Sequence, residues 1–324
     1  MTIDRRTLLA AGVAAGGLAL SEQFSVSPAE AGAPMATAQA PGFYRFKVGD
    51  YQVTAIHDGF AGRPLDGFVR NAKLDDVQKA MSTAFMPTDR LPLYFTALVI
   101  NTGSKLIAID TGNGNSGAPS SGKWMENLKA AGFAPEQIDT ILISHFHGDH
   151  INGLRLKDGT AVFPNTEIKV PEVEWTYWMD DAKMNAASDA LKGGFQGVRR
   201  VFNDMKNVSR YEWGKEVAPG ITAIQSEGHT PGHTSFMISS GNGKLLVMSD
   251  VVNLPSLFVR HPDWHAVFDM NGDIAAKTRK KMLDMAATEK TQVVFYHAPF
   301  PAAGYIEKSG SSYEFVPAVW SSGV

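Results

Sequence analysis

The sequence predicts an α/β fold in which two sheets pack together and helices lie outside, an arrangement that fits a four-layer αββα sandwich. Two observations lead to this prediction. Short apolar strand patterns occur in pairs, and these pairs alternate with helix patterns in two halves of the chain. Because a sheet has to bury its apolar face against another layer, sheets packed face to face with outer helices are favoured.

The first half of the pattern contains two predicted hairpins and two predicted helices. A loop is expected over 59–73, and a flexible Gly/Asn/Ser loop over 112–122. Gly132 is the expected C-cap of the second helix. The predicted strands are 43–48, 51–57, 94–101, 105–110 and 140–144, and the predicted helices are 73–84 and 122–132.

The second half contains seven predicted strands and three predicted helices. One helix begins at Pro171, at the first helical position that proline favours. Another covers 186–205, with a break at Gly193-Gly194, and the third covers 274–287. The predicted strands are 166–170, 221–226, 234–238, 244–249, 291–296, 304–307 and 313–317.

Composition restricts the chemistry. The 324 residues are 44% hydrophobic, which can bury one large core or two fused similar halves. The net charge of −3 gives no reason to expect nucleic acid or an anionic membrane as a partner. The chain has no cysteine, so disulfides, thiolate zinc sites and cysteine nucleophiles are excluded. Any metal ligand therefore has to be His, Asp or Glu.

Residues 1–31 are expected to be an export signal. Arg5 and Arg6 precede a weakly apolar run over residues 8–20, and small residues of the A-x-A type follow. The arginine pair resembles a twin-arginine signal, and the apolar run is too short to span a bilayer easily. We therefore expect a periplasmic or secreted bacterial protein, with a linker at 32–42, one domain at 43–324 and no membrane span after signal removal. A disordered cytoplasmic tail is the alternative.

Four metal-competent side chains follow the strand at 140–144 within six residues: His145, His147, Asp149 and His150. Alternation puts His145 and His147 on one side of an extended chain. Gly148 allows a turn, after which Asp149 and His150 face a second point nearby. Two ligand pairs facing two adjacent points indicate a dinuclear metal site. Imidazole and carboxylate suit two zinc ions, with iron, manganese or a mixed pair as alternatives.

Three further candidate ligands lie at strand ends. His233 leaves the Gly-His-Thr-Pro-Gly-His turn at 228–233, and Asp250 and His297 each end an apolar strand. A carboxylate at the end of such a strand is costly unless it is paired or bound to a metal.

The order H-x-H-x-D-H, His, Asp, His resembles the metallo-β-lactamase superfamily over about residues 43–317. The resemblance implies the αββα sandwich and a metal-dependent hydrolase. It also implies a role for each residue: His145, His147 and His233 for the first metal, Asp149, His150 and His297 for the second, and Asp250 as the bridge. His229 is expected to be structural or to support a ligand. Asp110 resembles a carboxylate that supports a ligand histidine. A simple strand-end turn is its alternative.

Within the superfamily, the chain looks most like methyl parathion hydrolase and its lactonase-like relatives, on segments such as 41–45, 98–106 and 127–133. This implies that a metal-activated hydroxide attacks a small lactone, aryl ester or phosphotriester, with Asp149 and Asp250 as catalytic groups. Trp178 and Phe195 match bulky pocket residues of that group, and ordinary packing is the alternative, since aromatics at helical spacing are usually core residues. Asn253 stands where acyl-homoserine lactonases often carry a tyrosine, and it is the third candidate substrate contact.

Other functions share this ligand pattern. A β-lactamase and an iron-dependent oxidoreductase are the alternative enzymes, and a nuclease ranks below them because the chain lacks a basic bias. The expected partner is a small molecule, and a homodimer is compatible with the sequence.

Overall fold

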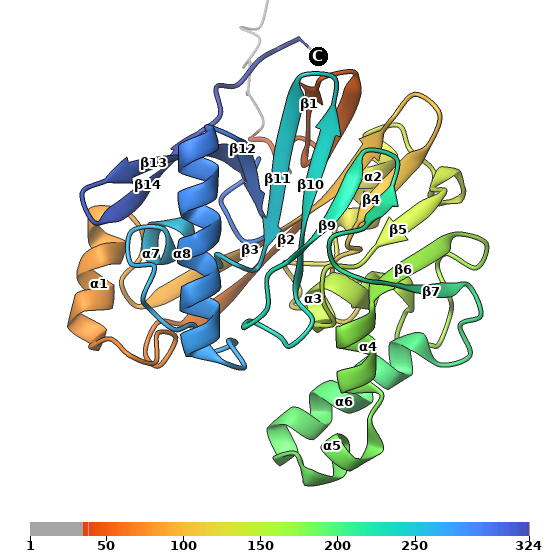
Figure 1. Cartoon of the computed structure of the whole chain (residues 1–324), viewed down its shortest axis with the longest axis horizontal. Helices are drawn as coiled ribbons and strands as arrows, with labels where there is room; N and C mark the ends of the chain where they lie inside the picture. Colours follow the sequence, from red (N-terminus) through yellow and green to blue (C-terminus); the bar gives the residue numbers. More distant parts are fainter. Residues whose placement is uncertain (1–34, 38, 324) are drawn as a thin grey trace, which may run out of the picture. The chain divides into compact units, whose positions relative to one another are not determined.

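Two seven-stranded sheets form the inner layers of the protein (Figure 1). The computed structural model describes residues 35–37 and 39–323. The predicted export signal and the first residues of the predicted linker lie outside these ranges. Within the described part, no helix has both the length and the apolar character needed to cross a membrane.

The first sheet has the strand order β1-β2-β3-β4-β5-β6-β7. Strands β1 to β4 pair antiparallel, and β4 to β7 pair parallel. The strands are β1 (Phe43–Val48), β2 (Tyr51–Pro64), β3 (Arg90–Asn101), β4 (Leu106–Ile109), β5 (Thr140–Leu142), β6 (Glu167–Pro171) and β7 (Val208–Tyr211).

The second sheet has the order β14-β13-β12-β11-β10-β9-β8. Its only parallel pair among the described strands is β11 with β12. The strands are β8 (Glu216–Ala218), β9 (Ile221–Gln225), β10 (Thr234–Ser240), β11 (Gly243–Ser249), β12 (Gln292–Phe295), β13 (Ala303–Ser309) and β14 (Ser312–Pro317).

Helices form the outer layers and complete the predicted αββα sandwich. A parallel pair needs a crossover connection, so α2 joins β4 to β5 and α8 joins β11 to β12. Figure 1 shows α8 along the second sheet and α4, α5 and α6 grouped together. The helices are α1 (Leu74–Thr83), α2 (Trp124–Ala130), α3 (Gly148–Ile151), α4 (Glu172–Trp178), α5 (Asp181–Ala186), α6 (Asp189–Phe202), α7 (Pro255–Phe258) and α8 (Gly272–Glu289), with 3₁₀ turns η1 (Pro135–Gln137) and η2 (Asn152–Leu154).

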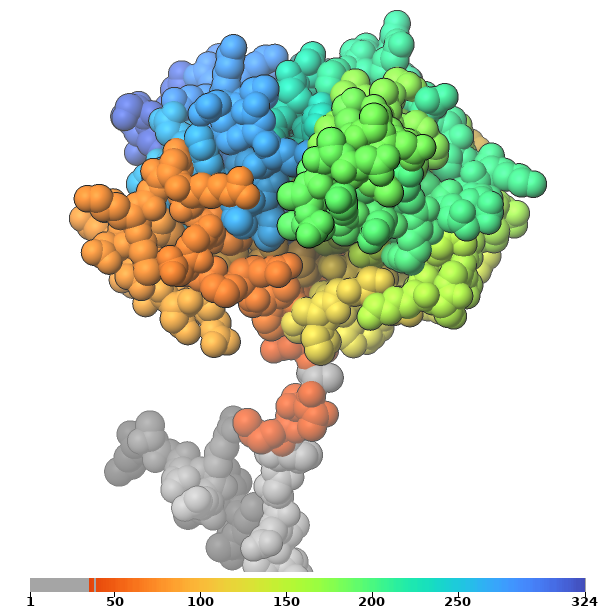
Figure 2. Space-filling model, turned by 90° about the horizontal axis from the view of Figure 1, so that it is seen from below, coloured from red at the N-terminus to blue at the C-terminus, as the bar shows by residue number. Residues whose placement is uncertain are grey.

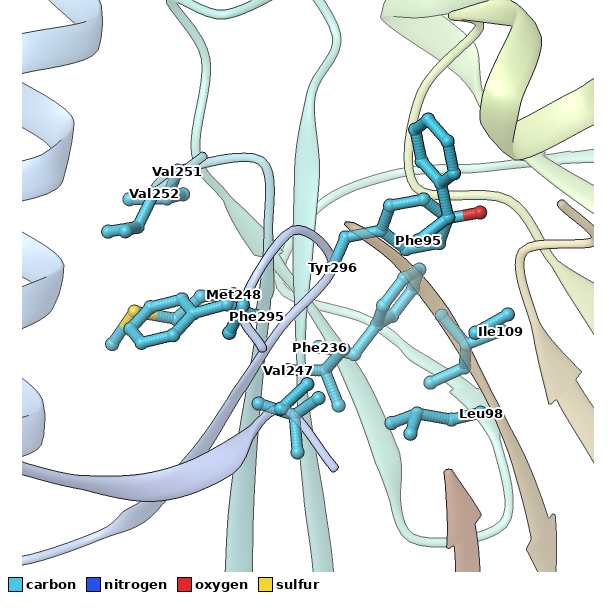
Figure 3. Packing of buried hydrophobic residues seen from close by; sticks show 14 of the residues in the cluster. Phe95, Leu98, Ile109, Phe236, Val247, Met248, Val251, Val252, Phe295 and Tyr296 are labelled. Atoms are coloured by element: carbon cyan, nitrogen blue, oxygen red, sulfur yellow. The ribbon is translucent and has the colours of Figure 1, made fainter. Parts of the chain in front are cut away.

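Apolar side chains from both sheets fill the space between them (Figure 3). Leu98 and Ile109 come from the first sheet, and Phe236, Val247 and Phe295 come from the second; all five are buried. Each such side chain contributes roughly 1.5–3 kcal/mol by leaving water. This core holds the strand ends of the two sheets in place beside one another.

Several elements differ from the sequence prediction. Pro171 is the last residue of β6 and the N-cap of α4, so the helix predicted to begin at Pro171 begins at Glu172. Strand β2 continues to Pro64 and β3 begins at Arg90, so the predicted loop at 59–73 starts as strand, with a bulge between His57 and Gly59. Helix α6 is unbroken at Gly193-Gly194, because its buried face outweighs the roughly 1 kcal/mol that each glycine costs. The short elements β7, β8 and α7 had too weak a pattern to be predicted.

Candidate metal centre

The predicted ligand residues meet at one end of the two sheets. The segment 145–150 follows β5, and His147 is the N-cap residue of α3. Asp250 directly follows β11, and His297 follows β12 by two residues. The loop between β9 and β10 brings His229 to the same place. The carboxyl ends of the two parallel pairs, β4 with β5 and β11 with β12, therefore supply most of the site.

His145, His147, His229 and Asp250 form a first cluster of potential metal ligands. Nδ1 of His147 lies 3.1 Å from Nε2 of His145 and 2.9 Å from Nε2 of His229. Oδ2 of Asp250 lies 3.2 Å from Nε2 of His229 and 4.0 Å from Nε2 of His145. Three imidazoles and one carboxylate that converge in this way form a donor set typical of zinc.

Asp149, His150 and His297 form a second cluster. Oδ2 of Asp149 lies 3.6 Å from Nε2 of each histidine. Asp250 reaches this cluster too, with Oδ1 3.3 Å from Nε2 of His150 and Oδ2 2.9 Å from Nε2 of His297. Asp250 therefore lies between the two clusters, which is the position of a bridging carboxylate.

Two buried atoms of the centre support metal binding. Nε2 of His150 and Oδ1 of Asp250 have no hydrogen-bond partner among the described residues, although buried polar atoms rarely lack one. Burial lowers the pKa of His145 well below its ordinary value, and the neighbouring His150 lowers it further, which keeps the His145 ring neutral. Burial opposes the charge on His150 as well, but Asp250, Asp149 and Asp110 raise its pKa well above the ordinary value. A metal cation in place of that proton would satisfy both unpaired atoms.

The structure differs from the sequence prediction in the third histidine of the first cluster. Nδ1 of His233 lies 2.9 Å from the hydroxyl and 3.0 Å from the carbonyl oxygen of Ser226, and its Nε2 accepts the backbone N–H of Asp250 at 3.1 Å. Both ring nitrogens of His233 are therefore engaged by the protein. His229, which was expected only to support the site, directs Nε2 into the cluster instead. The two histidines leave the same turn four residues apart, and the sequence could not separate their roles.

Asp110 contacts a candidate ligand, as the sequence suggested. Its Oδ2 lies 2.8 Å from Nδ1 of His150, and it accepts hydrogen bonds from the backbone and hydroxyl of Ser144, each at 2.8 Å. A carboxylate that holds one ring nitrogen of an imidazole orients the other nitrogen for metal binding. By holding Nδ1 of His150, Asp110 therefore directs its Nε2 towards the other members of the second cluster.

Two more supporting groups were missed by sequence analysis. Oδ1 of Asp269 lies 3.0 Å from Nδ1 of His229, and the carbonyl oxygen of Tyr94 lies 2.7 Å from Nδ1 of His297. Burial opposes the charge on His229, but the hydrogen bonds that its ring donates to Asp250 and Asp269 raise its pKa to about 9. Asp269 lies in a loop without a motif, and a main-chain carbonyl has no residue-type signal, so neither was visible in the sequence.

A cavity of about 480 Å³ opens onto both clusters. Its inner end exposes His147, Asp149, Asp250 and His297, and the 113–118 loop lines one side. Figure 2 looks onto the end of the molecule at which α3 and α4 lie, where orange, yellow, green and blue segments surround a hollow. The outer cavity wall is formed mainly by the side chains of Ala61, Arg63, Leu93, Phe95, Ala118 and Phe268.

The three predicted substrate contacts do not line this cavity. Trp178 and Phe195 are buried core residues of α4 and α6, with ring centroids 4.8 Å apart. The core-packing alternative therefore holds for both. Asn253 is also buried, and its Nδ2 lies 3.4 Å from Oδ2 of Asp250. The apolar part of the cavity lining comes instead from Ala61, Leu93, Phe95, Ala118 and Phe268, whose residue types carried no functional signal in the sequence.

Comparisons with known proteins agree with this geometry. Residues 93–297 match the profile of the Metallo-beta-lactamase superfamily. The chain is 28% identical over 171 residues to an N-acyl homoserine lactonase of a Bacillus species, and 25% identical over 170 residues to one of Bacillus cereus. Each alignment covers 52% of this chain and only 60% of the lactonase.

Two solved structures are similar over more of their length. AidC, described as a dizinc quorum-quenching lactonase in complex with a product, is 27% identical with a TM-score of 0.82, over 86% of this chain and 98% of AidC. The hydrolase AbOPH, described as a member of the beta lactamase superfamily, is 26% identical with a TM-score of 0.83, over 88% of this chain and 100% of AbOPH.

Proposed function

Because the chain belongs to the metallo-beta-lactamase superfamily, we propose that it is a dinuclear metal-dependent hydrolase that opens lactones. The observation that carries this proposal is the place of Asp250 between two clusters of metal-competent side chains. The similarity to AidC and to the Bacillus lactonases supports lactones as the substrate class. N-acyl homoserine lactones are the first substrates to test, and aryl esters and phosphotriesters are a wider class for the same site.

Two zinc ions are the proposed cofactors. His145, His147 and His229 would hold one ion, and Asp149, His150 and His297 the other, with Asp250 between them. When bound, such ions lower the pKa of water towards ~7 and polarise a carbonyl oxygen.

The residues around the cavity fit a lactone. Phe95 and Phe268 provide an apolar wall that suits an acyl chain and excludes water. Asp149 has 21% of its side chain exposed and faces the cavity, so its carboxylate can take a proton from the attacking water and return it to the ring oxygen. The water oxygen forms a bond to the carbonyl carbon, the bond between that carbon and the ring oxygen breaks, and the ring oxygen takes the proton, so the product is a hydroxy acid.

The test is to measure metal content and hydrolysis on one purified sample. We expect about two zinc ions per chain and hydrolysis of acyl homoserine lactones that a chelator abolishes and added zinc restores. Aryl acetates and paraoxon-type triesters assayed beside them define the substrate range. A zinc-loaded protein that leaves lactones intact would contradict the proposal, and nitrocefin hydrolysis or a functional iron content would favour the alternative enzymes.

We also propose that the chain is exported, on the basis of Arg5-Arg6 and the apolar run that follows. Lysine at both positions should leave the protein in the cytoplasm of the expressing bacterium, whereas the wild type should reach the periplasm. Equal fractionation of the two proteins would contradict twin-arginine export.

A further inference from the structure

Glu174 in α4 is a buried acid close to the metal centre that is a member of neither ligand cluster. Burying a carboxylate is costly unless hydrogen bonds compensate for the lost water. The hydrogen-bond partners of Glu174 therefore indicate the role of its carboxylate.

Both oxygens of Glu174 accept hydrogen bonds from the segments that carry candidate ligands. Oε1 accepts the backbone N–H of Phe146 at 3.0 Å and Nε1 of Trp178 at 2.8 Å. Oε2 accepts the backbone N–H of Gly232 at 2.7 Å. Phe146 lies between His145 and His147, and Gly232 belongs to the turn that presents His229. One carboxylate thus joins the two segments that supply all three histidines of the first cluster.

The contact with the second segment depends on close approach. A Cβ atom at Gly232 would overlap the backbone and Cβ of Glu174. The turn therefore lies directly against α4, and only glycine allows this. Trp178 packs on Phe195 and fixes the carboxylate from the side of the core. Trp178, which sequence analysis named as a candidate for either the pocket or the core, thus supports the carboxylate from the core.

We infer that Glu174 is a positioning residue, which sets the spacing of the His145–His147 segment and the His229 turn and so forms the first metal site. The inference rests on the metal centre of the proposed function. The second cluster draws Asp149 and His150 from α3 and His297 from the residues after β12, and none of the three is hydrogen-bonded to Glu174, so loss of Glu174 should weaken the first site more than the second.

An amide cannot replace the carboxylate. Three N–H groups donate to Glu174 and the Thr230 hydroxyl is a further contact, whereas a glutamine offers one acceptor oxygen and an NH₂ group. If the glutamine oxygen keeps the hydrogen bonds from Phe146 and Trp178, its NH₂ group faces the N–H of Gly232. Two donors then face each other, and the hydrogen bond that holds the His229 turn against α4 is lost. Glu174→Gln is therefore a test with almost no change in volume.

The experiment measures zinc binding by competition with a chelator, together with the absorption spectrum of the cobalt-substituted protein. In Glu174→Gln we expect zinc affinity at one of the two sites to fall about 10–100-fold, as is typical when a group behind the ligands is lost. The other site should lose less of its affinity, and the cobalt bands of the weakened site should change at saturating metal. A role in stability alone would lower the melting temperature without changing the spectrum.

Glu172→Gln is the matched control. Glu172 lies on the same helix but pairs with Arg210 at 3.1 Å near the surface, so this variant should bind both metals like the wild type. Unchanged affinities and cobalt spectrum in Glu174→Gln would overturn the inference, as would an equal loss at both sites. If the wild type bound no metal, the proposed function would fail instead.

A measurement on the wild type covers the case in which Glu174→Gln does not fold. Glu174 is the hydrogen-bond partner of the Phe146 and Gly232 amides, so both should be protected from hydrogen exchange even in the zinc-free protein. Fast exchange at either amide, with the core strands still protected, would also overturn the inference.

Discussion

The two halves of the molecule use the same strand–helix–strand frame but place a carboxylate differently at its end. In the first half the frame is β4, α2 and β5, and in the second it is β11, α8 and β12. A non-glycine residue with positive φ lies at the end of each first strand: Asp110, at 63°, directly follows β4, and Ser249, at 47°, is the last residue of β11. In the first half this residue is itself the carboxylate, whereas in the second half the carboxylate is the next residue, Asp250.

This offset of one residue separates a supporting group from a bridging one. Asp110 contacts Nδ1 of His150, which points away from the candidate metal site. Asp250 instead contacts Nε2 of His150 in the second cluster and Nε2 of His229 in the first. The hydroxyl of Ser249 donates to that of Ser144 at 2.9 Å, and Ser144 in turn donates to Asp110 at 2.8 Å. The two strained turns, each costing on the order of 1–3 kcal/mol, are thus joined directly beneath the candidate metal site.

Replacing Asp250 is expected to give the largest effect. Asp250→Ala removes the carboxylate that lies beside the ligand nitrogens of both clusters, so both metals should be lost and lactone hydrolysis should fall by more than about 100-fold, beyond the loss typical of supporting groups. Metal analysis and steady-state kinetics check this. Retained zinc stoichiometry together with a retained rate would show that Asp250 is not the bridge.

The second prediction separates the two histidines of the 228–234 turn. His229→Ala should lose one metal and most activity, because its Nε2 faces the first cluster. His233→Ala should keep both metals at saturating zinc, since its nitrogens contact Ser226 and the backbone of Asp250. Zinc titration of the two variants side by side measures how many metals each one binds. Loss of a metal in His233→Ala but not in His229→Ala would show that His233 is the ligand, as the sequence analysis predicted.

The same contrast shows what sequence could predict. The ligands of the first half lie within six residues of one strand, where local geometry determines which way each side chain faces, and sequence reasoning brought them together. Asp250 and His297 could be predicted as ligands because each ends an apolar strand, where burying a polar side chain is costly unless it is paired or bound to a metal. His229 and Asp269 depend on how distant segments pack, and no local pattern carries that information. Trp178 was misplaced because an aromatic residue on a helix has the same pattern in a core and in a pocket.

Supporting carboxylates should give intermediate effects, each at its own site. Asp110→Asn should weaken metal binding at the His150 site, and Asp269→Asn at the His229 site, by about 10–100-fold each. Two-site competition titrations measure this directly. A loss at the same site in both variants would contradict the view that each half supports its own ligand histidine.

Metal binding should depend on pH through the His229 ring. In the metal-free protein the pKa of His229 is about 9, so below that pH a proton occupies the ring and a metal ion has to displace it. Affinity at this site should therefore rise about tenfold per pH unit from pH 7 to pH 9 and level off above. The slope should be weaker in Asp269→Asn, because loss of that carboxylate lowers the pKa of His229. An affinity that is flat over this range would contradict the prediction.

Asn253 should give the smallest effect, because it contacts Asp250, the proposed bridge, without lining the cavity. Its hydrogen bond to Asp250 is long, at 3.4 Å, and a bond of this kind is worth at most about 1 kcal/mol. Asn253→Ala should therefore change zinc affinity and kcat by no more than about fivefold, with KM unchanged. Phe268→Ala is the useful comparison, because Phe268 lines the cavity and its loss should raise KM more for long acyl chains than for short ones. A large rise in KM in the Asn253 variant would show that the side chain reaches the substrate after all, and would move this position back into the pocket.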